Sequence, residues 1–229
     1  MPIHKDVNRA FFKKWSPEMS YVLGLFAADG TMIANSRGAY FIEFHLTDRE
    51  VLLKIKKVLK ADHKISMRNR HNPNHKMGYR LQIGSKEMFE DLTNLGFVPN
   101  KSLVLKMPSI PTRYIKHFVR GYFDGDGCVY FRQHYAKDRG KMKWSFTSRF
   151  TCGSKVFLQD LWRMLGNHVK KGSLYVKSKN SGYELVFSHL DSLALFKFMY
   201  NNLDTDLYMV RKHRLFAKAL KTLYGYVGA

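Results

Sequence analysis

The segment FVRGYFDGDG, residues 118–127, ends a largely apolar stretch in Asp-Gly-Asp-Gly. A second segment, YVLGLFAADG at residues 21–30, has a glycine at the same distance before a final Asp-Gly. A helix commonly ends where a glycine follows its last apolar turn. The two segments are therefore predicted to be equivalent helices, each of which ends at its aspartate.

The sequence that follows each segment repeats as well. Residues 39–59 and 143–165 both combine strand-like alternation with a helical pattern, and a further strand and helix follow at 78–92 and 182–196. Internal repeats of this kind determine the fold. Each half is predicted to contain a helix, two strands, a helix, two strands and a helix, which gives an α+β fold with duplicated αββαββα halves.

Prolines mark the boundary between the halves. Three of the six prolines lie in residues 98–112, which are predicted to form a linker. The first half is assigned to residues 1–97 and the second to residues 113–229. After residue 206 the second half has a basic amphipathic helix, interpreted as a packed surface helix, with a capping role or a backbone contact as the alternatives.

Local sequence indicates where the first of the two equivalent helices, here called the motif helices, begins and where both helices end. Ser16, Pro17 and Glu18 combine a capping side chain, a proline suited to the first turn and an acid that the helix dipole favours. Gly30 and Gly127 follow the two aspartates, where a helix end favours a left-handed residue. We therefore expect both glycines to be left-handed caps.

Small residues recur four positions apart on one side of each predicted helix. They are Gly24 and Ala28 in the first helix and Gly121 and Gly125 in the second. This spacing lets two helix backbones approach closely. Parallel packing would bring Asp29 and Asp126 together at two negative helix ends, where the carboxylates repel each other unless a cation binds.

Two carboxylates without His or Cys partners favour a hard divalent cation. Mg²⁺ is the expected ion, and Mn²⁺ is expected to substitute for it. A single Asp-Gly at a helix end is often only a turn. Two of them in a repeated setting favour a functional site, and the sequence therefore predicts a metal site at Asp29 and Asp126.

The composition indicates a polyanionic partner. The chain has 39 Lys and Arg against 18 Asp and Glu, and its net charge is +21. No apolar run approaches the about 18 residues of a membrane span, so we expect no membrane association. Cys128 and Cys152 lack CxxC spacing, and we expect free thiols and an intracellular location.

The predicted strands alternate apolar with polar or basic residues. Successive side chains of a strand point to opposite faces, so each sheet should have one buried face and one basic face. A basic face suits phosphate and base contacts in the major groove of DNA, whereas an ordinary solvated face, the alternative, would mix both charge signs. The candidate DNA-binding residues are Lys64, Ser66, Arg68, Arg70, Arg80, Gln82, Arg132, Lys143, Ser145, Thr147, Arg149, Lys171, Ser173, Tyr175 and Lys177.

The pair VLGLFAADG (22–30) and VRGYFDGDG (119–127) resembles the motifs of the LAGLIDADG homing endonucleases, in the single-chain form with two motifs. The resemblance extends over about residues 17–200. It implies two pseudo-twofold halves, motif helices packed at the centre, and antiparallel sheets that form a DNA-binding saddle. It also implies a monomer that makes double-strand breaks in long DNA targets, as intron-encoded members of the family do.

The resemblance also implies roles for individual residues. Asp29 and Asp126 match the metal-binding catalytic carboxylates, and the backbone carbonyls of Ala28 and Gly125 are expected to contact metal as well. The mechanism expected from the family is metal-dependent phosphodiester hydrolysis.

Relatives often carry a lysine before a hydrophobic-Pro step ahead of the second motif. Lys106 fits this position best, and Lys101 is the other candidate. Ala27 departs from the acid in the family's name, but that position does not carry the chemistry. Its counterpart Asp124 is interpreted as a supporting or structural residue.

A second class of function fits the same charge and sheets. A non-cleaving nucleic-acid binder, either an RNA maturase that binds intron RNA or a regulator, would use the basic faces but would have no need for both aspartates. Cleavage of double-stranded DNA is therefore the prediction, and the binder is its alternative.

Overall fold

The computed structural model describes residues 5–68, 77–178 and 181–225. Arg70, one of the candidate DNA-binding residues, lies outside them. The chain divides by its internal contacts into two compact units. Unit 1 comprises Met1–Gly125 with Asp204–Tyr208, and unit 2 comprises Asp126–Leu203 with Met209–Ala229.

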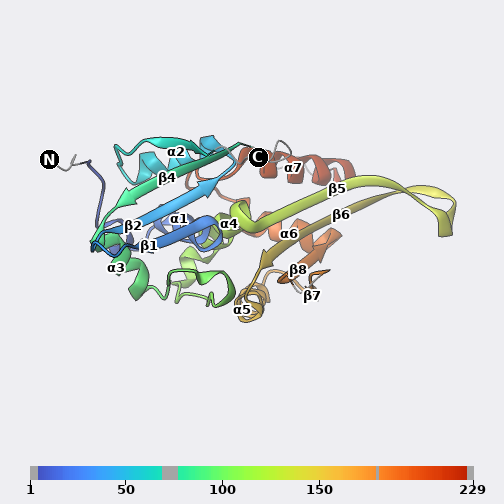
Figure 1. Cartoon of the computed structure of the whole chain (residues 1–229). Coiled ribbons are helices and arrows are strands. Elements are labelled where there is room, and N and C mark those ends of the chain that lie inside the picture. The colour runs from blue at the N-terminus through green and yellow to red at the C-terminus, as the bar shows by residue number, and fades with distance from the viewer. Residues whose placement is uncertain (1–4, 69–76, 179–180, 226–229) are drawn as a thin grey trace. The chain divides into compact units, whose positions relative to one another are not determined.

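Unit 1 contains one antiparallel sheet and its covering helices (Figure 1). Its elements in chain order are α1 (Pro17–Asp29), β1 (Gly30–Ala34), β2 (Tyr40–Leu46), α2 (Arg49–Val58), β3 (Ile65–Arg68), β4 (Gly78–Gly84), α3 (Lys86–Asn94) and α4 (Ile115–Asp126). The sheet has the strand order β1-β2-β4-β3. Although α4 begins the second repeat of the sequence, its residues up to Gly125 pack in unit 1.

Unit 2 repeats the arrangement with a second antiparallel sheet of strand order β5-β6-β8-β7. Its elements are β5 (Gly127–Ala136), β6 (Lys141–Cys152), α5 (Lys155–Leu165), β7 (Ser173–Val176), β8 (Tyr183–Ser188), α6 (His189–Tyr200) and α7 (Val210–Tyr224). With α4 counted in the second repeat, both halves have the order αββαββα. The predicted α+β fold with duplicated halves is confirmed.

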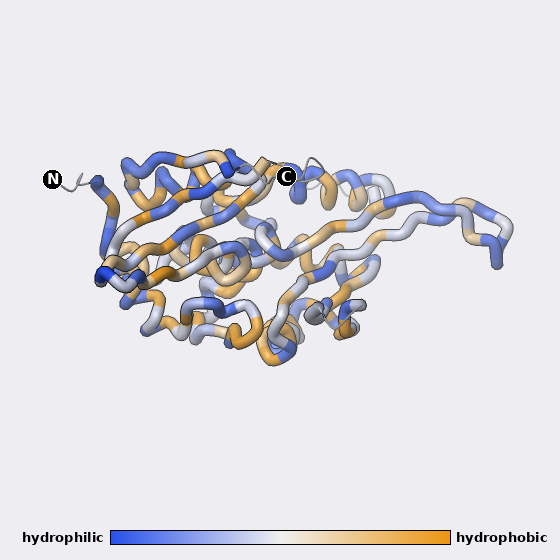
Figure 2. The backbone as a smooth tube through the Cα atoms, viewed as in Figure 1, coloured by the Kyte–Doolittle hydropathy of each residue, from blue (hydrophilic) through white to orange (hydrophobic). Residues whose placement is uncertain are grey.

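The two-residue period of the central strands produces the two faces of each sheet. In β4, Leu81 and Ile83 are fully buried, whereas Arg80 and Gln82, which alternate with them, are half-buried. β6 alternates in the same way along its inner half, and Figure 2 shows apolar and polar residues mixed along the strands. Helices α2 and α3 pack against unit 1's sheet, and α5, α6 and α7 against unit 2's sheet.

The alternation fails in the edge strands β3 and β7. The alternation with the polar residues of these strands places Met67 in β3 and Val176 in β7 on the apolar faces, but 71% and 61% of their surfaces are exposed. Both strands are four-residue strands at a sheet edge, where the helices no longer cover the apolar side. Periodicity alone therefore overestimates the buried area of these strands.

The start of α1 is as predicted, but its end differs. The Ser16 side chain accepts a hydrogen bond from the Met19 backbone nitrogen at 3.0 Å, with proline in the first turn. Gly30 is extended, with φ −89° and ψ 154°, because α1 leads directly into β1. Glycine is needed there for another reason, since a Cβ would lie 2.2 Å from the Phe26 ring. Gly127 has no left-handed φ either, and it begins β5.

The segment predicted as a linker, residues 98–112, contains no α-helix and no strand. It includes a short 3-10 helix at Lys101–Leu103, and it buries Lys101 and Leu105. Within the residues that the structure describes, none of the helices has both the length and the apolar character needed to cross a bilayer.

Candidate active site and nucleic-acid interface

Helices α1 and α4 approach each other through glycines. A Cβ at Gly24 would lie 2.1 Å from the Phe118 carbonyl oxygen, and a Cβ at Gly121 would lie 2.0 Å from the Tyr21 carbonyl oxygen. Atoms this close cannot coexist, so each helix requires glycine where the other helix's backbone touches it. The predicted close packing of the two motif helices through small residues is therefore present within unit 1.

The same contact continues to the C-terminal ends of the helices. A Cβ at Gly125 would lie 2.3 Å from the Ala28 Cβ and 2.9 Å from Asp29 Oδ2. Ala28 and Gly125, whose carbonyls were predicted to contact metal, thus face each other beside the Asp29 carboxylate. Asp126 is the next residue along the chain and the last of α4, and both motif aspartates are half-buried.

Asp124 has a structural partner in the other motif helix. Its side chain is fully buried, and Oδ2 accepts a hydrogen bond from the Tyr21 hydroxyl at 2.8 Å. A typical intramolecular hydrogen bond contributes about 0.5–1.5 kcal/mol, so this pair helps to hold α1 against α4. The supporting role predicted for Asp124 agrees with this contact.

Of the two candidate lysines, the structure brings only Lys101 to a motif. Lys101 is 6% exposed, its Nζ donates to the carbonyl oxygen of Gly30, and it lies 5.5 Å from the centre of the Phe26 ring. Lys106, which the sequence favoured, is exposed at the surface. The spacing before the hydrophobic-Pro step favoured Lys106 because it contains no sign of the burial of Lys101, the first residue of the 3-10 helix Lys101–Leu103.

A second buried lysine makes the equivalent hydrogen bond in unit 2, to the glycine after the motif aspartate. The sequence did not lead us to predict it. Lys212 of α7 is 6% exposed, and its Nζ donates to the carbonyl oxygen of Gly127 at 2.6 Å. The residues directly after both motif aspartates therefore accept a hydrogen bond from a buried ammonium group. The sequence did contain a sign of this, because Lys212 falls in the apolar stripe of α7 with the buried residues Phe216 and Ala219.

Buried Arg120 of α4 fixes the segment Asp204–Tyr208 to unit 1. Its Nε donates to the Leu207 carbonyl oxygen at 3.0 Å, and Nη2 lies 3.1 Å from Thr205 Oγ1 and 3.1 Å from His117 Nδ1. Burial, and then the Arg120 charge, lower the pKa of His117 to about 4. His117 is therefore neutral at pH 7 and can accept the hydrogen bond from Arg120.

The polar face of the unit 1 sheet is organised around one buried acid. Glu43 is 3% exposed, and its carboxylate contacts His45 Nε2 at 2.7 Å and Arg80 Nη1 at 3.6 Å and also accepts a hydrogen bond from Gln82. Of the other predicted DNA-binding residues, Ser66 and Arg68 lie in β3 and Lys64 directly precedes it. Arg80 and Gln82 are therefore held by contacts within the sheet.

The polar face of the unit 2 sheet is longer. Lys143, Ser145, Thr147 and Arg149 alternate along β6, and Arg132 pairs with Ser145 from β5. Arg149 Nη1 lies 3.5 Å from Glu184 Oε2, which is this sheet's counterpart of the pairing between Arg80 and Glu43. Ser173 and Tyr175 lie in β7, and Lys171 and Lys177 flank that strand.

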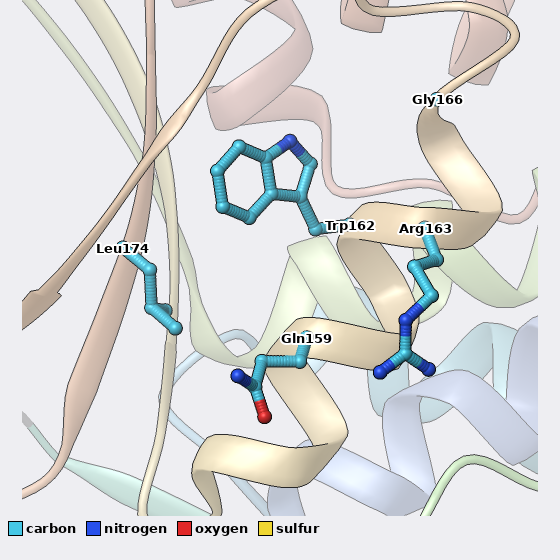
Figure 3. Close-up of a pocket in the computed structure, with 5 residues that line it drawn as sticks. All are labelled: Gln159, Trp162, Arg163, Gly166 and Leu174. Atoms are coloured by element: carbon cyan, nitrogen blue, oxygen red, sulfur yellow. The ribbon is translucent and has the colours of Figure 1, made fainter.

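A pocket of about 390 Å³ lies apart from these features, between α5 and β7 of unit 2 (Figure 3). It is lined by Gln159, Trp162, Arg163, Gly166 and Leu174. Neither motif aspartate nor either buried lysine lines it, and Arg163 forms an ion pair with Asp160 of its own helix. The pocket is therefore not part of the candidate active site.

Solved structures with a similar fold are homing endonucleases. The I-LtrWI LAGLIDADG homing endonuclease bound to target DNA is 14% identical with a TM-score of 0.57, over 94% of this chain and 92% of that chain. The homing endonuclease I-WcaI bound to its DNA recognition sequence is 12% identical with a TM-score of 0.61, over 91% of each chain. I-SmaMI bound to cleaved DNA is 12% identical with a TM-score of 0.60, over 91% of this chain and 90% of that chain. At these identities, the similarity establishes the fold.

The sequence itself matches a family of known proteins. A search among curated proteins found no match. The family described as the LAGLIDADG-like domain matches residues 16–95 and, a second time, residues 113–199. The two matches cover most of the chain and coincide with its two repeats. The chain therefore belongs to the LAGLIDADG-like domain family, with two motifs in one chain.

Proposed function

We propose that the chain is a site-specific endonuclease that cuts both strands of double-stranded DNA by divalent-metal-dependent hydrolysis, as a monomer and as an intron-encoded homing enzyme. One repeated arrangement carries the proposal. Each motif helix ends in an aspartate, and the following glycine accepts a hydrogen bond from a buried lysine. Membership of the LAGLIDADG-like family and the DNA-bound state of the similar structures support it.

The donor atoms at the motifs fit a hard cation. The Asp29 carboxylate and the backbone carbonyls of Ala28 and Gly125 are oxygen donors, as Mg²⁺ and Mn²⁺ prefer. Within residues 5–68, 77–178 and 181–225, no group of three or more His, Cys, Asp and Glu could hold a metal. Such a site therefore needs further oxygen ligands, which substrate phosphates and water provide. When bound, the ion would lower the pKa of a water molecule and stabilise charge on phosphate oxygens.

The chain's own residues supply charge and positioning. Asp29 and Asp126 would each contribute a carboxylate to hold a divalent cation at its motif, which would orient the phosphate. Lys101 and Lys212 each hold the first residue of the strand that follows the motif, through the carbonyls of Gly30 and Gly127. Their ammonium groups also offset the negative charge that develops on the phosphate during attack.

The sheet faces bind the duplex. Arginine and lysine side chains contact phosphates, and Arg, Gln, Ser and Thr side chains can donate to base edges in the major groove. Glu43 and Glu184 fix the orientation of Arg80 and Arg149, so fewer side-chain rotations are lost on binding.

The proposal is tested with the uninterrupted form of the gene's own insertion site as the substrate. We expect the purified chain to convert a plasmid that carries this sequence to linear DNA in Mg²⁺ or Mn²⁺, and to bind it without cutting in EDTA. An unrelated plasmid should stay intact. Binding without cleavage in both metals, particularly with equal affinity for intron RNA, would contradict the proposal and favour the non-cleaving binder.

A further inference from the structure

A short segment near the end of the chain packs apart from the residues on either side of it. Asp204–Tyr208 belongs to unit 1, whereas the neighbouring residues Leu203 and Met209 belong to unit 2. We call Asp204–Tyr208 the anchored segment. Lys212 of α7 lies four positions after its end, and Lys212 Nζ donates to the carbonyl oxygen of Gly127 in unit 2. The point at which the chain leaves unit 1 therefore limits where Lys212 can lie, because each residue adds at most about 3.6 Å of reach.

Arg120 of α4 binds the anchored segment directly. Its Nε donates to the carbonyl oxygen of Leu207 at 3.0 Å, and Nη2 lies 3.1 Å from Thr205 Oγ1. The Leu207 backbone nitrogen lies 3.4 Å from the same hydroxyl oxygen. Arg120 is 1% exposed, and Leu207 is fully buried. One buried guanidinium group thus fixes the main chain of the segment just before α7 begins.

Two lysines hold the rest of the anchored segment. Lys54 of α2 donates from Nζ to the carbonyl oxygen of Asp206 at 2.9 Å, and it lies 4.9 Å from the centre of the Tyr208 ring. Lys116 Nζ lies 3.7 Å from Asp204 Oδ2. Ion pairs near the surface contribute little to stability, so the main hold on the segment comes from the buried guanidinium group.

The first repeat has no charge at the position of Arg120. Arg120 directly precedes Gly121, and Leu23 directly precedes Gly24 in the first motif helix. Both side chains are buried, with 1% and 0% of their surfaces exposed. Burying a guanidinium group costs free energy that burying a leucine does not. Packing of the motif helices alone therefore does not require a charge here, and the contact that accounts for Arg120 is the anchored segment.

The same two stretches of chain are joined a second time in unit 2. From Arg120 to Gly127 the first stretch runs for seven positions, and from Leu207 to Lys212 the second runs for five. Most of the first stretch belongs to α4, and the second enters α7. A helix is a rigid element and transmits a shift at one end to the other. A shift of the Leu207 backbone would therefore move the Lys212 ammonium group relative to Gly127.

We propose that Arg120 is a positioning residue for Lys212. By holding the anchored segment, Arg120 sets the place of the Lys212 ammonium group at the second motif, and thereby the rate at which that motif cuts its strand. The inference rests on the proposed function, since it assumes that each motif cuts one DNA strand and that Lys212 assists the second motif. A displacement of about 1 Å at a reacting group can cost about 100-fold in rate. Loss of Arg120 should therefore resemble loss of Lys212.

The experiment measures the two strands of one duplex separately. A linear duplex with the insertion site carries a different label on each strand, and initial rates are measured in Mg²⁺ at saturating protein. The variants are Arg120→Met, Lys212→Met and the two combined. A further double variant combines Arg120→Met with Lys101→Met, because Lys101 contacts the first motif and not the second. Affinity for the same duplex is measured in EDTA.

We expect Arg120→Met to slow one strand by about 10- to 100-fold, and to leave the other strand and the affinity near their wild-type values. The slowed strand should be the one that Lys212→Met slows. On that strand the combined variant should match Lys212→Met within about twofold, because both changes act through one ammonium group. Arg120→Met with Lys101→Met should instead slow both strands, each by the effect of one change.

Arg163→Met is the matched control. Arg163 is an exposed arginine of α5 that pairs with Asp160 of its own helix, so both strands should be cut at the wild-type rate. Thr205→Val decides the question if circular dichroism shows that Arg120→Met is unfolded. It keeps the shape of the side chain and removes the hydroxyl beside Arg120 Nη2, and it should slow the same strand by about 2- to 10-fold.

The outcomes separate the inference from the proposed function. The inference is wrong if Arg120→Met slows both strands equally or neither, if its effect multiplies that of Lys212→Met, or if Lys212→Met itself cuts both strands normally. In each of these cases the wild-type chain still cuts, and the endonuclease assignment stands. If the wild-type chain cuts neither strand, both proposals fail together.

Discussion

Glycine at positions 24 and 121 is set by atoms of the opposite helix. The nearest atoms to an added Cβ are backbone carbonyl oxygens at 2.1 and 2.0 Å, so no side-chain rotation can relieve the clash. Gly125 differs, because its nearest neighbours are the side chains of Ala28 and Asp29. The first two glycines thus determine whether the motif helices can pack, and the third determines the space around a motif carboxylate.

Gly24→Ala and Gly121→Ala are each expected to destabilise the protein by about 3 kcal/mol or more, at the upper end of the range for overpacked sites. Gly84→Ala is the matched control, since its Cβ would come no closer than 3.4 Å to another atom, in the Phe41 ring, and its effect should stay within about 1 kcal/mol. Denaturant unfolding measures all three. Losses at positions 24 and 121 no larger than the control's would contradict the helix contact.

At the scale of elements, periodicity predicted most helices and the central strands, because β4 and β6 are covered on one side and alternate accordingly. The edge strands β3 and β7 and the ends of the motif helices were less predictable. Gly30 is extended rather than left-handed, since the pairing of β1 with β2 begins at that residue. The choice between Lys101 and Lys106, and the role of Lys212, depend on contacts with residues 71 to 85 positions away along the chain, which no local pattern contains.

The three lysines can be compared by substitution with methionine, which keeps the length of the side chain and removes its charge. Lys101→Met and Lys212→Met are each expected to reduce the rate of DNA cleavage by about 100-fold, the usual cost of losing one preorganised donor. The free energy of unfolding should fall by about 1–3 kcal/mol, because the carbonyl of Gly30 or Gly127 loses its buried donor.

Lys106→Met provides the control for this comparison. Its side chain is exposed, so cleavage should continue at the wild-type rate. Initial rates on a linear duplex with each strand labelled would resolve all three variants. If Lys106→Met were the slow variant and Lys101→Met were fully active, the role assigned to Lys101 would be wrong.

At the scale of the whole molecule, the sequence repeat and the packing units do not coincide. The repeat begins again at α4, whereas the contacts assign this helix up to Gly125 to unit 1. The reason lies in α1, where every residue from Met19 to Ala27 is buried. The sheet of unit 1 can cover only one side of this helix, so a second element, α4, must cover another side. The repeat in the sequence predicted the duplicated halves, and the spacing of small residues predicted that α1 and α4 pack closely, as the contacts at Gly24 and Gly121 show.

The central claim is that the two motif aspartates together make this fold an enzyme. The most direct measurement is cleavage of the insertion-site plasmid in Mg²⁺ by Asp29→Asn and Asp126→Asn, with Asp62→Asn, an exposed acid, as the control. The account predicts that each motif variant loses linear product by about 100-fold or more while it still binds the DNA in EDTA, and that Asp62→Asn cuts normally. Wild-type rates of linearisation by either motif variant would contradict it.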